Sequence, residues 1–322
     1  MARWPVVARV AVELGDGRRE WAELREGQTA WEAAGAFLDG LGGVDGAPDR
    51  AALTELLDPD RRDWVVLVTV SFGFRDMFMN WHAWFKMLSL DMRVVFVAED
   101  ADALALCLSL QGLTCVKWTD SDAPSGPHRY GTSGFVDLVA NRPMYVKRAL
   151  DEFDNVIYSD IDTVWLADPR PFFTGNADVW GQLDSGDAFE YIVCSGFLAF
   201  RGTPGARRLV NEWSREFLEG EMDQPPLNRA IKLLQMQKDD SKSVRFVPLP
   251  RTRFPSGDMF FRTHAFLGLD VVFDVVIVHN NWINGKDNKI RRFKEVGLWV
   301  ENVVAYLDLV VGSLGQTVVD NA

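Results

Sequence analysis

The sequence has few cysteines, and this excludes two classes of small scaffold. Its 322 residues include three cysteines, at Cys107, Cys115 and Cys194. Three scattered cysteines are too few for a disulfide framework or for a zinc site of the Cys-x-x-Cys type, and at most one disulfide can form. A hydrophobic core must therefore hold the fold together, and 12 tryptophans and 21 phenylalanines supply one.

Basic residues are also fewer than acidic ones. Lysine and arginine number 34 against 46 aspartates and glutamates, a formal net charge of −12. Nucleic acids and anionic membranes attract cationic surfaces, so no nucleic acid is expected as the main partner. An anionic ligand would need a local group of basic side chains or a metal ion.

Long apolar runs are missing as well. The longest begin at Trp64 and Val271 and fall well short of the ~18 residues of a membrane-spanning helix, so we expect no membrane span. No long apolar segment precedes Glu13, and the sequence has no Asn-x-Ser/Thr site. These features predict a cytoplasmic protein, with the Golgi lumen as the alternative if an anchor was removed.

The first 60 residues differ in pattern from the rest. An alternating segment around a Gly-Asp-Gly turn predicts a hairpin, and a short helix ending at glycines follows it. A stretch rich in glycine, proline and aspartate then resembles a linker. We interpret residues 1–60 as a small β/α extension of unknown role and residues 61–322 as one larger domain.

Strands and helices alternate in this larger domain, which predicts parallel pairing and right-handed crossovers. The expected fold is α/β: an open, mostly parallel twisted sheet with helices on both faces. The strands are predicted at 64–72, 93–98, 114–118, 155–159, 178–183, 191–201 (antiparallel) and 271–279, and the helices at 77–90, 101–110, 135–153, 204–218, 224–237 and 286–297.

A pair of aspartates follows the strand predicted at 155–159. Side chains two residues apart on a strand share a face, so Asp160 and Asp162 would point the same way while Ile161 points to the core. Two carboxylates so close repel each other unless a cation or a donor lies between them. Ligands of open α/β sheets bind at the carboxyl ends of strands, so a metal site is predicted, with a solvated turn as the alternative.

A second apolar strand ends at His279 and is followed by Gly285 and a helix that opens with Lys286 and Lys289. Imidazole is a good ligand for transition metals, and a helix start with a nearby lysine favours phosphate. Together with the aspartate pair, this set suits a divalent cation that bridges a diphosphate. Taken alone, a single histidine is more often structural.

Further polar residues follow predicted strands or open helices. Asp184 lies at a strand end, and Asp223 with Gln224 precedes a helix, where an ordinary N-cap is the simpler interpretation. Ser195 and Gly196 would allow close backbone approach to a ligand, although a bulge explains them equally well.

Taken in order, these segments resemble glycosyltransferase family 77, whose nucleotide-diphospho-sugar transferase domain has the GT-A fold. The resemblance covers residues 64–300. It rests on Asn80-Trp81, YSDIDTVWLADP from Tyr158, CSGFLAFR, MDQPPLN, LPRTRFPSGDMFF and, most specifically, VHNNWINGKDNKIRRFKEVGLW from Val278.

The resemblance implies a retaining transferase that moves a sugar, galactose or xylose, from a UDP-sugar to a glycan or protein acceptor with Mn²⁺ or Mg²⁺. It implies the following roles: Asp160, Asp162 and His279 hold the metal; Asp160 also lies near the ribose; Thr69, Val70 and Ser71 lie beside uracil; Gly285 and Lys289 hold the diphosphate; Asp184, Asp223 and Gln224 face the donor sugar as catalytic candidates. Arg142 stands before Pro143 where the family has lysine, which leaves the donor sugar open because the two cations are not interchangeable.

Two other functions fit parts of the sequence. The Asp-Ile-Asp-Thr-Val segment also matches haloacid-dehalogenase-like phosphatases, in which Asp160 would be the nucleophile and Asp162 a general acid. That fold usually carries the motif on its first strand, whereas here almost a hundred residues of α/β pattern precede it. A non-catalytic sugar-nucleotide-binding module is the third hypothesis, and turnover distinguishes it from an enzyme.

Overall fold

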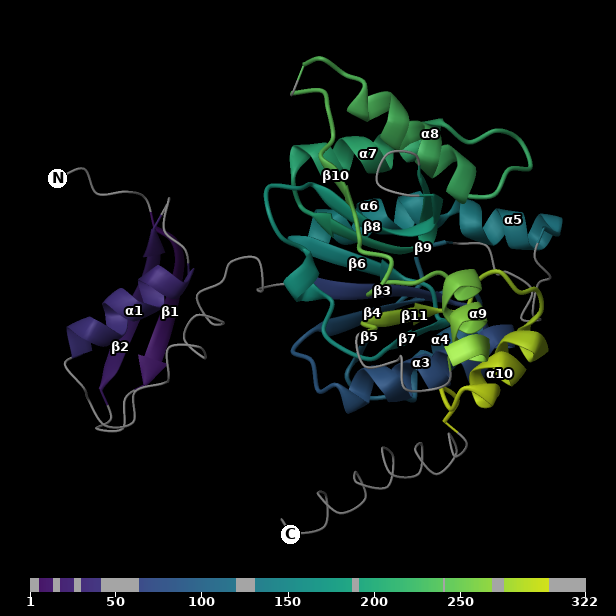
Figure 1. Ribbon diagram of the computed structural model, residues 1–322, viewed down its shortest axis with the longest axis horizontal. Coiled ribbons are helices and arrows are strands. Elements are labelled where there is room, and N and C mark those ends of the chain that lie inside the picture. The colour runs from purple at the N-terminus through teal and green to yellow at the C-terminus, as the bar shows by residue number, and fades with distance from the viewer. Residues whose placement is uncertain are drawn as a thin grey trace, which may run out of the picture. The chain divides into compact units, whose positions relative to one another are not determined.

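The computed structural model describes residues 6–13, 18–25, 30–41, 64–119, 131–186, 191–239, 241–267 and 275–300. The chain divides into two compact units, residues 1–63 and residues 64–322 (Figure 1). In the first unit, β1 (Val6–Glu13) and β2 (Arg19–Arg25) form an antiparallel hairpin, and α1 (Ala30–Leu41) follows. The hairpin and the helix predicted from alternation and from the glycines are both present.

The second unit is built on a seven-stranded sheet. Its order is β10-β8-β9-β6-β3-β4-β5, and β9 is antiparallel to both of its neighbours while the other pairs are parallel. The strands are β3 (Trp64–Val70), β4 (Arg93–Ala98), β5 (Leu113–Val116), β6 (Asn155–Ser159), β8 (Val179–Gly186), β9 (Tyr191–Arg201) and β10 (Phe246–Pro248). This confirms the predicted mostly parallel sheet and the antiparallel strand at 191–201.

Helices cover both faces of this sheet because the central strands are apolar on both sides (Figure 1). Along β3, Trp64 and Val66 join the core beneath α3 (Arg75–Met87) and α4 (Ala101–Leu108). Val65 and Leu67 join the opposite core, beneath α6 (Arg142–Glu152), α7 (Pro204–Arg215) and α8 (Gln224–Gln235). The α/β fold class predicted from the sequence is therefore confirmed.

The helix predicted over 135–153 is two helices, α5 (Ser133–Ala140) and α6. The break falls at Asn141, directly before Arg142 and Pro143. Proline has no N–H and suits the first turn of a helix, so Pro143 begins α6 and ends the continuous pattern. The prediction of one helix was wrong here, and the new helix start places Arg142 in the first turn of α6.

A small antiparallel pair joins two segments that are far apart in the sequence. β7 (Thr163–Trp165) pairs with β11 (Ile277–His279), so that His279 lies opposite Thr163. The strand predicted at 271–279 is thus short, and its residues 271–274 lie outside the described residues. Helices α9 (Gly257–Leu267) and α10 (Lys286–Glu295) flank this pair, and short 3₁₀ turns occur at Phe72–Phe74 and Arg170–Phe172.

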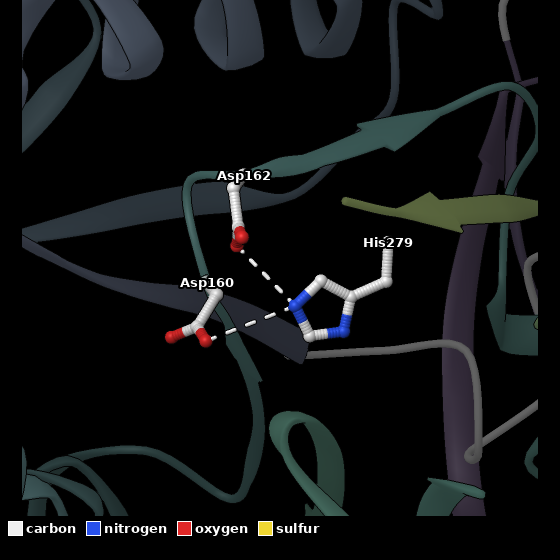
Figure 2. A group of neighbouring side chains, drawn as sticks. All are labelled: Asp160, Asp162 and His279. Atoms are coloured by element: carbon white, nitrogen blue, oxygen red, sulfur yellow. Dashed lines mark ion pairs between the residues drawn. The ribbon is translucent and has the colours of Figure 1, made fainter. Parts of the chain in front are cut away.

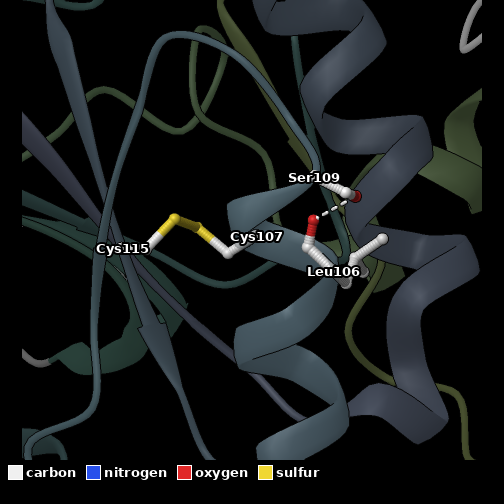
Figure 3. The surroundings of a disulfide bond; sticks show 4 residues. All are labelled: Leu106, Cys107, Ser109 and Cys115. Atoms are coloured by element: carbon white, nitrogen blue, oxygen red, sulfur yellow. Dashed lines mark hydrogen bonds between the residues drawn. A yellow bond between two sulfur atoms is a disulfide. The ribbon is translucent and has the colours of Figure 1, made fainter. Parts of the chain in front are cut away.

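One disulfide joins Cys107, in the last turn of α4, to Cys115 on β5 (Figure 3). Their Cα atoms are 5.9 Å apart, within the range that a disulfide spans. Cys194 is free and buried. This agrees with the limit of one disulfide set by the cysteine count. No helix in the described part of the chain is long and apolar enough to cross a bilayer.

Candidate active site

The two aspartates lie in the turn between β6 and β7. Strand β6 ends at Ser159, so Asp160 and Asp162 belong to a tight turn and not to a strand as the sequence analysis assumed. The turn is fixed because the Thr163 hydroxyl donates to the Asp160 carbonyl at 2.8 Å, and the Asp160 N–H donates to the Gly196 carbonyl at 2.7 Å. Both carboxylates nevertheless point the same way, toward His279 (Figure 2).

His279 reaches the aspartates from the end of β11. Its Nε2 lies 3.3 Å from Asp162 Oδ1 and 3.9 Å from Asp160 Oδ2. One ligand atom from each of the three residues lies within 4.8 Å of the others. The imidazole is 2% exposed, so protein atoms fix its orientation. The structure therefore brings together the three residues for which a metal-binding role was predicted.

Gln182 orients the imidazole. The Gln182 amide nitrogen donates to the carbonyls of Phe254, at 3.3 Å, and of Pro255, at 2.7 Å. The amide oxygen is thereby turned toward His279 Nδ1, 2.8 Å away. Because that oxygen only accepts, Nδ1 carries the hydrogen and Nε2 is the atom directed at the aspartates. A metal-ligating histidine typically has such a partner on its other nitrogen.

Basic side chains neutralise the carboxylates. Lys289 Nζ donates to Asp162 Oδ2. Burial alone would raise the pKa of Asp162, but Lys289 and His279 outweigh it and hold that pKa well below its usual range. Burial would likewise lower the pKa of His279, but the Cys194 sulfur and the Asp162 carboxylate more than offset it, and the pKa is raised. Asp162 is therefore ionised and surrounded by positive charge.

Arg142 links the aspartate turn to the start of α8. Its guanidinium donates to Asp160 Oδ1 at 2.6 Å and to Asp223 Oδ2 at 2.7 Å. The cation lies over the Tyr158 ring, and the Tyr158 hydroxyl also donates to Asp160 Oδ1, at 3.0 Å. Burial raises the pKa of Asp223, against the opposing effect of Arg142. One arginine thus holds two predicted site carboxylates in a fixed relation.

Gly196 leaves the space that the cluster needs. A Cβ at this position of β9 would lie 2.5 Å from Asp160 Oδ2 and 2.5 Å from His279 Cε1. Real Cβ contacts do not come so close, so any side chain would displace one of the two groups. The close approach suggested for Gly196 in the sequence is thus toward the site's own side chains.

Two cavities meet at these residues. The smaller, of about 130 Å³, and the larger, of about 590 Å³, share Phe135, Val139, Arg142, Asp160, Asp162 and Lys289 as lining residues. Thr69, Ser71 and Glu99 line only the smaller cavity, which is otherwise mainly apolar. Ligand pockets commonly measure about 300–1,000 Å³, and the larger cavity falls within that range. The two cavities therefore adjoin at Asp160 and Asp162.

The residues predicted to face the donor sugar line the larger cavity. Asp184 Oδ1 accepts from Asn281 and Trp282, both at 2.9 Å, and Asp184 Oδ2 accepts from Gln224 at 3.2 Å. Gln224 Oε1 in turn accepts from the Ser195 N–H at 3.3 Å. Asp184, Asp223 and Gln224 are therefore neighbours, as the prediction requires.

The other predicted residues divide into two groups. Thr69 and Ser71 line the smaller cavity, whereas the Val70 side chain lies in the core. Gly285 does not line either cavity and precedes α10 with φ of +88°, a conformation that glycine adopts readily. Its role in holding a diphosphate stays a prediction.

Sequence reasoning missed several residues of the site. Glu99 is 5% exposed and accepts from the Tyr145 hydroxyl at 2.9 Å, and burial raises the pKa of Glu99 from 4.5 to about 7. Gln182 and Trp282 were not singled out either. Only Trp282 carried a usable signal, because it follows His279 within the most specific motif.

The residues present fit a divalent cation. Two carboxylates and an imidazole are ligands that Mn²⁺ accepts, and hard oxygen ligands also suit Mg²⁺. The fit is supported by the orientation of His279, whose Nε2 is directed at both aspartates while its Nδ1 contacts Gln182. The set is therefore suited to hold a cation between the turn and β11.

Comparisons with known proteins point to one family. The family model for nucleotide-diphospho-sugar transferases matches residues 89–293, more than half of the chain. A UDP-D-xylose:L-fucose α-1,3-D-xylosyltransferase of Arabidopsis thaliana is 28% identical over 265 residues, which cover 74% of this chain and 67% of the relative. A UDP-galactose:fucoside α-3-galactosyltransferase of Dictyostelium discoideum is 25% identical, with 74% of this chain and 43% of the relative covered.

Among solved structures, the glycosyltransferase GlyE of Streptococcus pneumoniae is similar with a TM-score of 0.45 and 14% identity. The alignment covers 78% of this chain and 64% of that protein, so the chain matches less than two thirds of its length. The family assignment rests on the sequence match, which spans Asp160, Asp162 and His279. The chain belongs to the nucleotide-diphospho-sugar transferase family.

Proposed function

We propose that the protein is a retaining glycosyltransferase that moves galactose or xylose from a UDP-sugar to an acceptor hydroxyl, with Mn²⁺ or Mg²⁺ as cofactor. The observation that carries the proposal is the convergence of Asp160, Asp162 and His279, with Lys289 beside them, where the two cavities meet. Relatives whose names specify UDP-xylose and UDP-galactose support this choice of donor.

The donor would lie along both cavities. The uridine would occupy the smaller cavity beside Thr69 and Ser71, and the diphosphate would lie at the shared residues. Asp160, Asp162 and His279 would hold the cation, which, when bound, neutralises negative charge on the diphosphate. The Lys289 ammonium lines both cavities and would bind the same diphosphate, because it presents a point charge to phosphate oxygens.

The sugar would lie in the larger cavity. Departure of UDP leaves positive charge on the anomeric carbon, which carboxylates nearby would stabilise. Asp184 and Asp223 line this cavity and would provide the stabilising negative charge. Gln224 is held between Asp184 and the Ser195 N–H. Arg142 keeps Asp223 at a fixed distance from the aspartate turn. Retention follows if the acceptor hydroxyl attacks from the face that UDP leaves, or if Asp223 or Gln224 forms an intermediate.

The compartment is a separate proposal. The sequence alone favoured the cytoplasm, whereas disulfides such as Cys107–Cys115 persist in oxidising compartments. We therefore propose the alternative, the Golgi lumen. Thiol labelling of the protein from its native cells, after denaturation but without reduction, would leave both cysteines unlabelled, whereas Cys194 would react as a free thiol. Complete labelling of Cys107 and Cys115 would contradict this location.

The two other hypotheses fit less well. In a haloacid-dehalogenase-like phosphatase, the segment with His279 and Lys289 would have no function, although both contact Asp162. A non-catalytic binding module would retain the cluster without turnover. Turnover of a UDP-sugar distinguishes such a module from a transferase.

A panel of UDP-sugars tests the proposal. The full chain is incubated with UDP-galactose, UDP-xylose and UDP-glucose, with Mn²⁺ or with a chelator, and released UDP is measured. We expect release from one of the first two sugars that depends on the metal. No release from any donor, or release of phosphate from an aryl phosphate instead, would contradict the proposal.

A further inference from the structure

Trp282 is exposed at the edge of the larger cavity. Its side chain lines that cavity and the residue is 59% exposed, whereas Trp81, Trp165, Trp180 and Trp213 are each less than 2% exposed. It is the one tryptophan among the large exposed hydrophobic residues of the described part of the chain. An indole left in water gives up the stabilisation that burial would provide, so its place at a cavity indicates a binding surface.

The backbone at Trp282 is strained. Its φ is +60°, in the left-handed region that bulky residues rarely adopt. Such strain persists only where surrounding contacts determine the conformation, and it gathers at functional sites. The nearest determining contact is the hydrogen bond from the indole N–H to Asp184 Oδ1, at 2.9 Å.

That hydrogen bond also determines what the ring can offer a ligand. Because its N–H donates to Asp184, the exposed part of the indole is carbon. A ligand therefore stacks on the ring and does not accept a hydrogen bond from it. The same Asp184 carboxylate accepts from Asn281 and Gln224, so the ring is fixed relative to the side chains that line the donor-sugar region.

The occupant must be apolar on one face and polar elsewhere, because the ring is bordered by Asp184, Asn281 and Asn284 in the same cavity. A pyranose ring has this character: its axial C–H groups form an apolar face and its hydroxyls surround it. The xylosyltransferase and the galactosyltransferase relatives described above are named for transfer to L-fucose and to a fucoside, and that sugar adds a methyl group to the apolar face.

We propose that Trp282 is the stacking platform for the acceptor, a pyranose of the 6-deoxy type, and that Asp184 positions the indole for it. This inference rests on the proposed function, since it places the acceptor next to a donor sugar held in the same cavity. The glycan acceptor is the occupant that the relatives' names favour, and a peptide acceptor is an alternative outcome of the test.

Steady-state transfer to methyl α-L-fucoside tests the proposal in the full chain, with Mn²⁺ and the UDP-sugar that the donor panel identifies. Trp282→Ala should raise the KM for the fucoside about tenfold or more, a loss of roughly 1.4 kcal/mol. Trp282→Phe keeps a ring but loses the N–H that Asp184 orients, so it should recover only part of the affinity. The KM for the UDP-sugar should change by less than about threefold in both variants.

Two further variants make the result decisive. Trp282→Gly removes the ring but tolerates a positive φ, so its effect on fucoside KM should match that of Trp282→Ala without any loss of folding. Met236→Ala, at an exposed methionine that lines neither cavity, is the matched surface control.

Contradictory outcomes are distinct. An unchanged fucoside KM in Trp282→Ala and Trp282→Gly overturns the platform and leaves the proposed function intact. An equal rise in donor KM, or transfer to a peptide that is insensitive to Trp282, overturns it as well. A wild-type protein that hydrolyses no UDP-sugar would instead contradict the proposed function itself.

Discussion

The two cavities differ in chemistry although they share one wall. Beyond the shared residues, the smaller has mainly apolar side chains with Glu99 as its one acidic group, whereas the larger is lined by Asp184, Asp223 and several amides. An apolar, narrow space suits a flat base, and a polar, wider space suits sugars. A ligand that spans both cavities would contact the shared residues along its middle and each of the other groups at one end only.

The largest effect is expected at the cation cluster, in which Asp162 belongs to the shared wall and His279 lines the larger cavity. Asp162→Ala removes a carboxylate from the cation cluster, and His279→Ala removes its only imidazole, so each variant should lose metal-dependent turnover by more than about 1,000-fold. UDP release at saturating Mn²⁺ measures this loss. Asp258→Ala, which breaks an exposed ion pair on α9, is the control and should retain activity. Full activity in either cluster variant would refute the site.

The next largest loss of activity is expected from a steric clash at Gly196. In Gly196→Ala the new Cβ would lie 2.5 Å from both Asp160 Oδ2 and His279 Cε1, so one of them must move. Misplacement of this size costs about 100-fold in activity. Mn²⁺ affinity and turnover should therefore both fall while the circular dichroism spectrum stays unchanged.

Gly40→Ala is the matched control for this variant, because no atom lies within 4 Å of a Cβ added there. If Gly196→Ala binds Mn²⁺ as tightly as the wild type, the close packing around the cluster has no functional meaning.

A smaller effect is expected at Arg142, which lines both cavities. Arg142→Lys keeps the charge but replaces a planar fork, which donates to Asp160 and Asp223 together, by a point charge. We expect a loss of about 10- to 100-fold in kcat/KM for the UDP-sugar. Arg170→Lys changes a comparable arginine–aspartate pair outside both cavities and serves as the control. Equal activity of Arg142→Lys and the wild type would contradict the linking role.

The last effect concerns stability and not activity, and it isolates the smaller cavity. Burial raises the pKa of Glu99 from 4.5 to about 7, so the folded protein retains a proton that the unfolded chain releases between these values. The contribution of Glu99 to the free energy of unfolding is therefore fully present below pH 4.5. It is lost as the pH rises to 7, by about 1.4 kcal/mol for each pKa unit. Glu99→Gln does not titrate.

Urea unfolding at several pH values measures this difference. The free energy of unfolding of the wild type, relative to Glu99→Gln, should fall between pH 4.5 and 7 and stay level above pH 7. A difference that rises with pH would show that the carboxyl is not desolvated in the fold.

Much of the fold was predictable because its signals are local. The apolar run of β3, the alternation of strands and helices and the Asp160–Asp162 pair all lie in continuous segments. The break between α5 and α6 was missed although Pro143 signals it, since the apolar pattern continues across Asn141. Local patterns therefore predicted the sheet and the helices that cover it, but not the end of every helix.

The contacts that orient the site were not predictable. The hydrogen bond between Gln182 and His279 joins residues 97 apart, and that between Trp282 and Asp184 joins residues 98 apart. Nothing in the sequence around Gln182 distinguishes it from other strand residues. Its role follows only when β8 and β11 deliver the two side chains to the same place.

The central claim is that one divalent cation binds between the aspartate turn and β11, next to the diphosphate. Its most direct test is an electron paramagnetic resonance titration of Mn²⁺ into the full chain, with and without UDP. We predict one site whose affinity UDP increases, and loss of that site in His279→Ala. Equal Mn²⁺ affinity of the wild type and His279→Ala, with no effect of UDP on either, would contradict the claim.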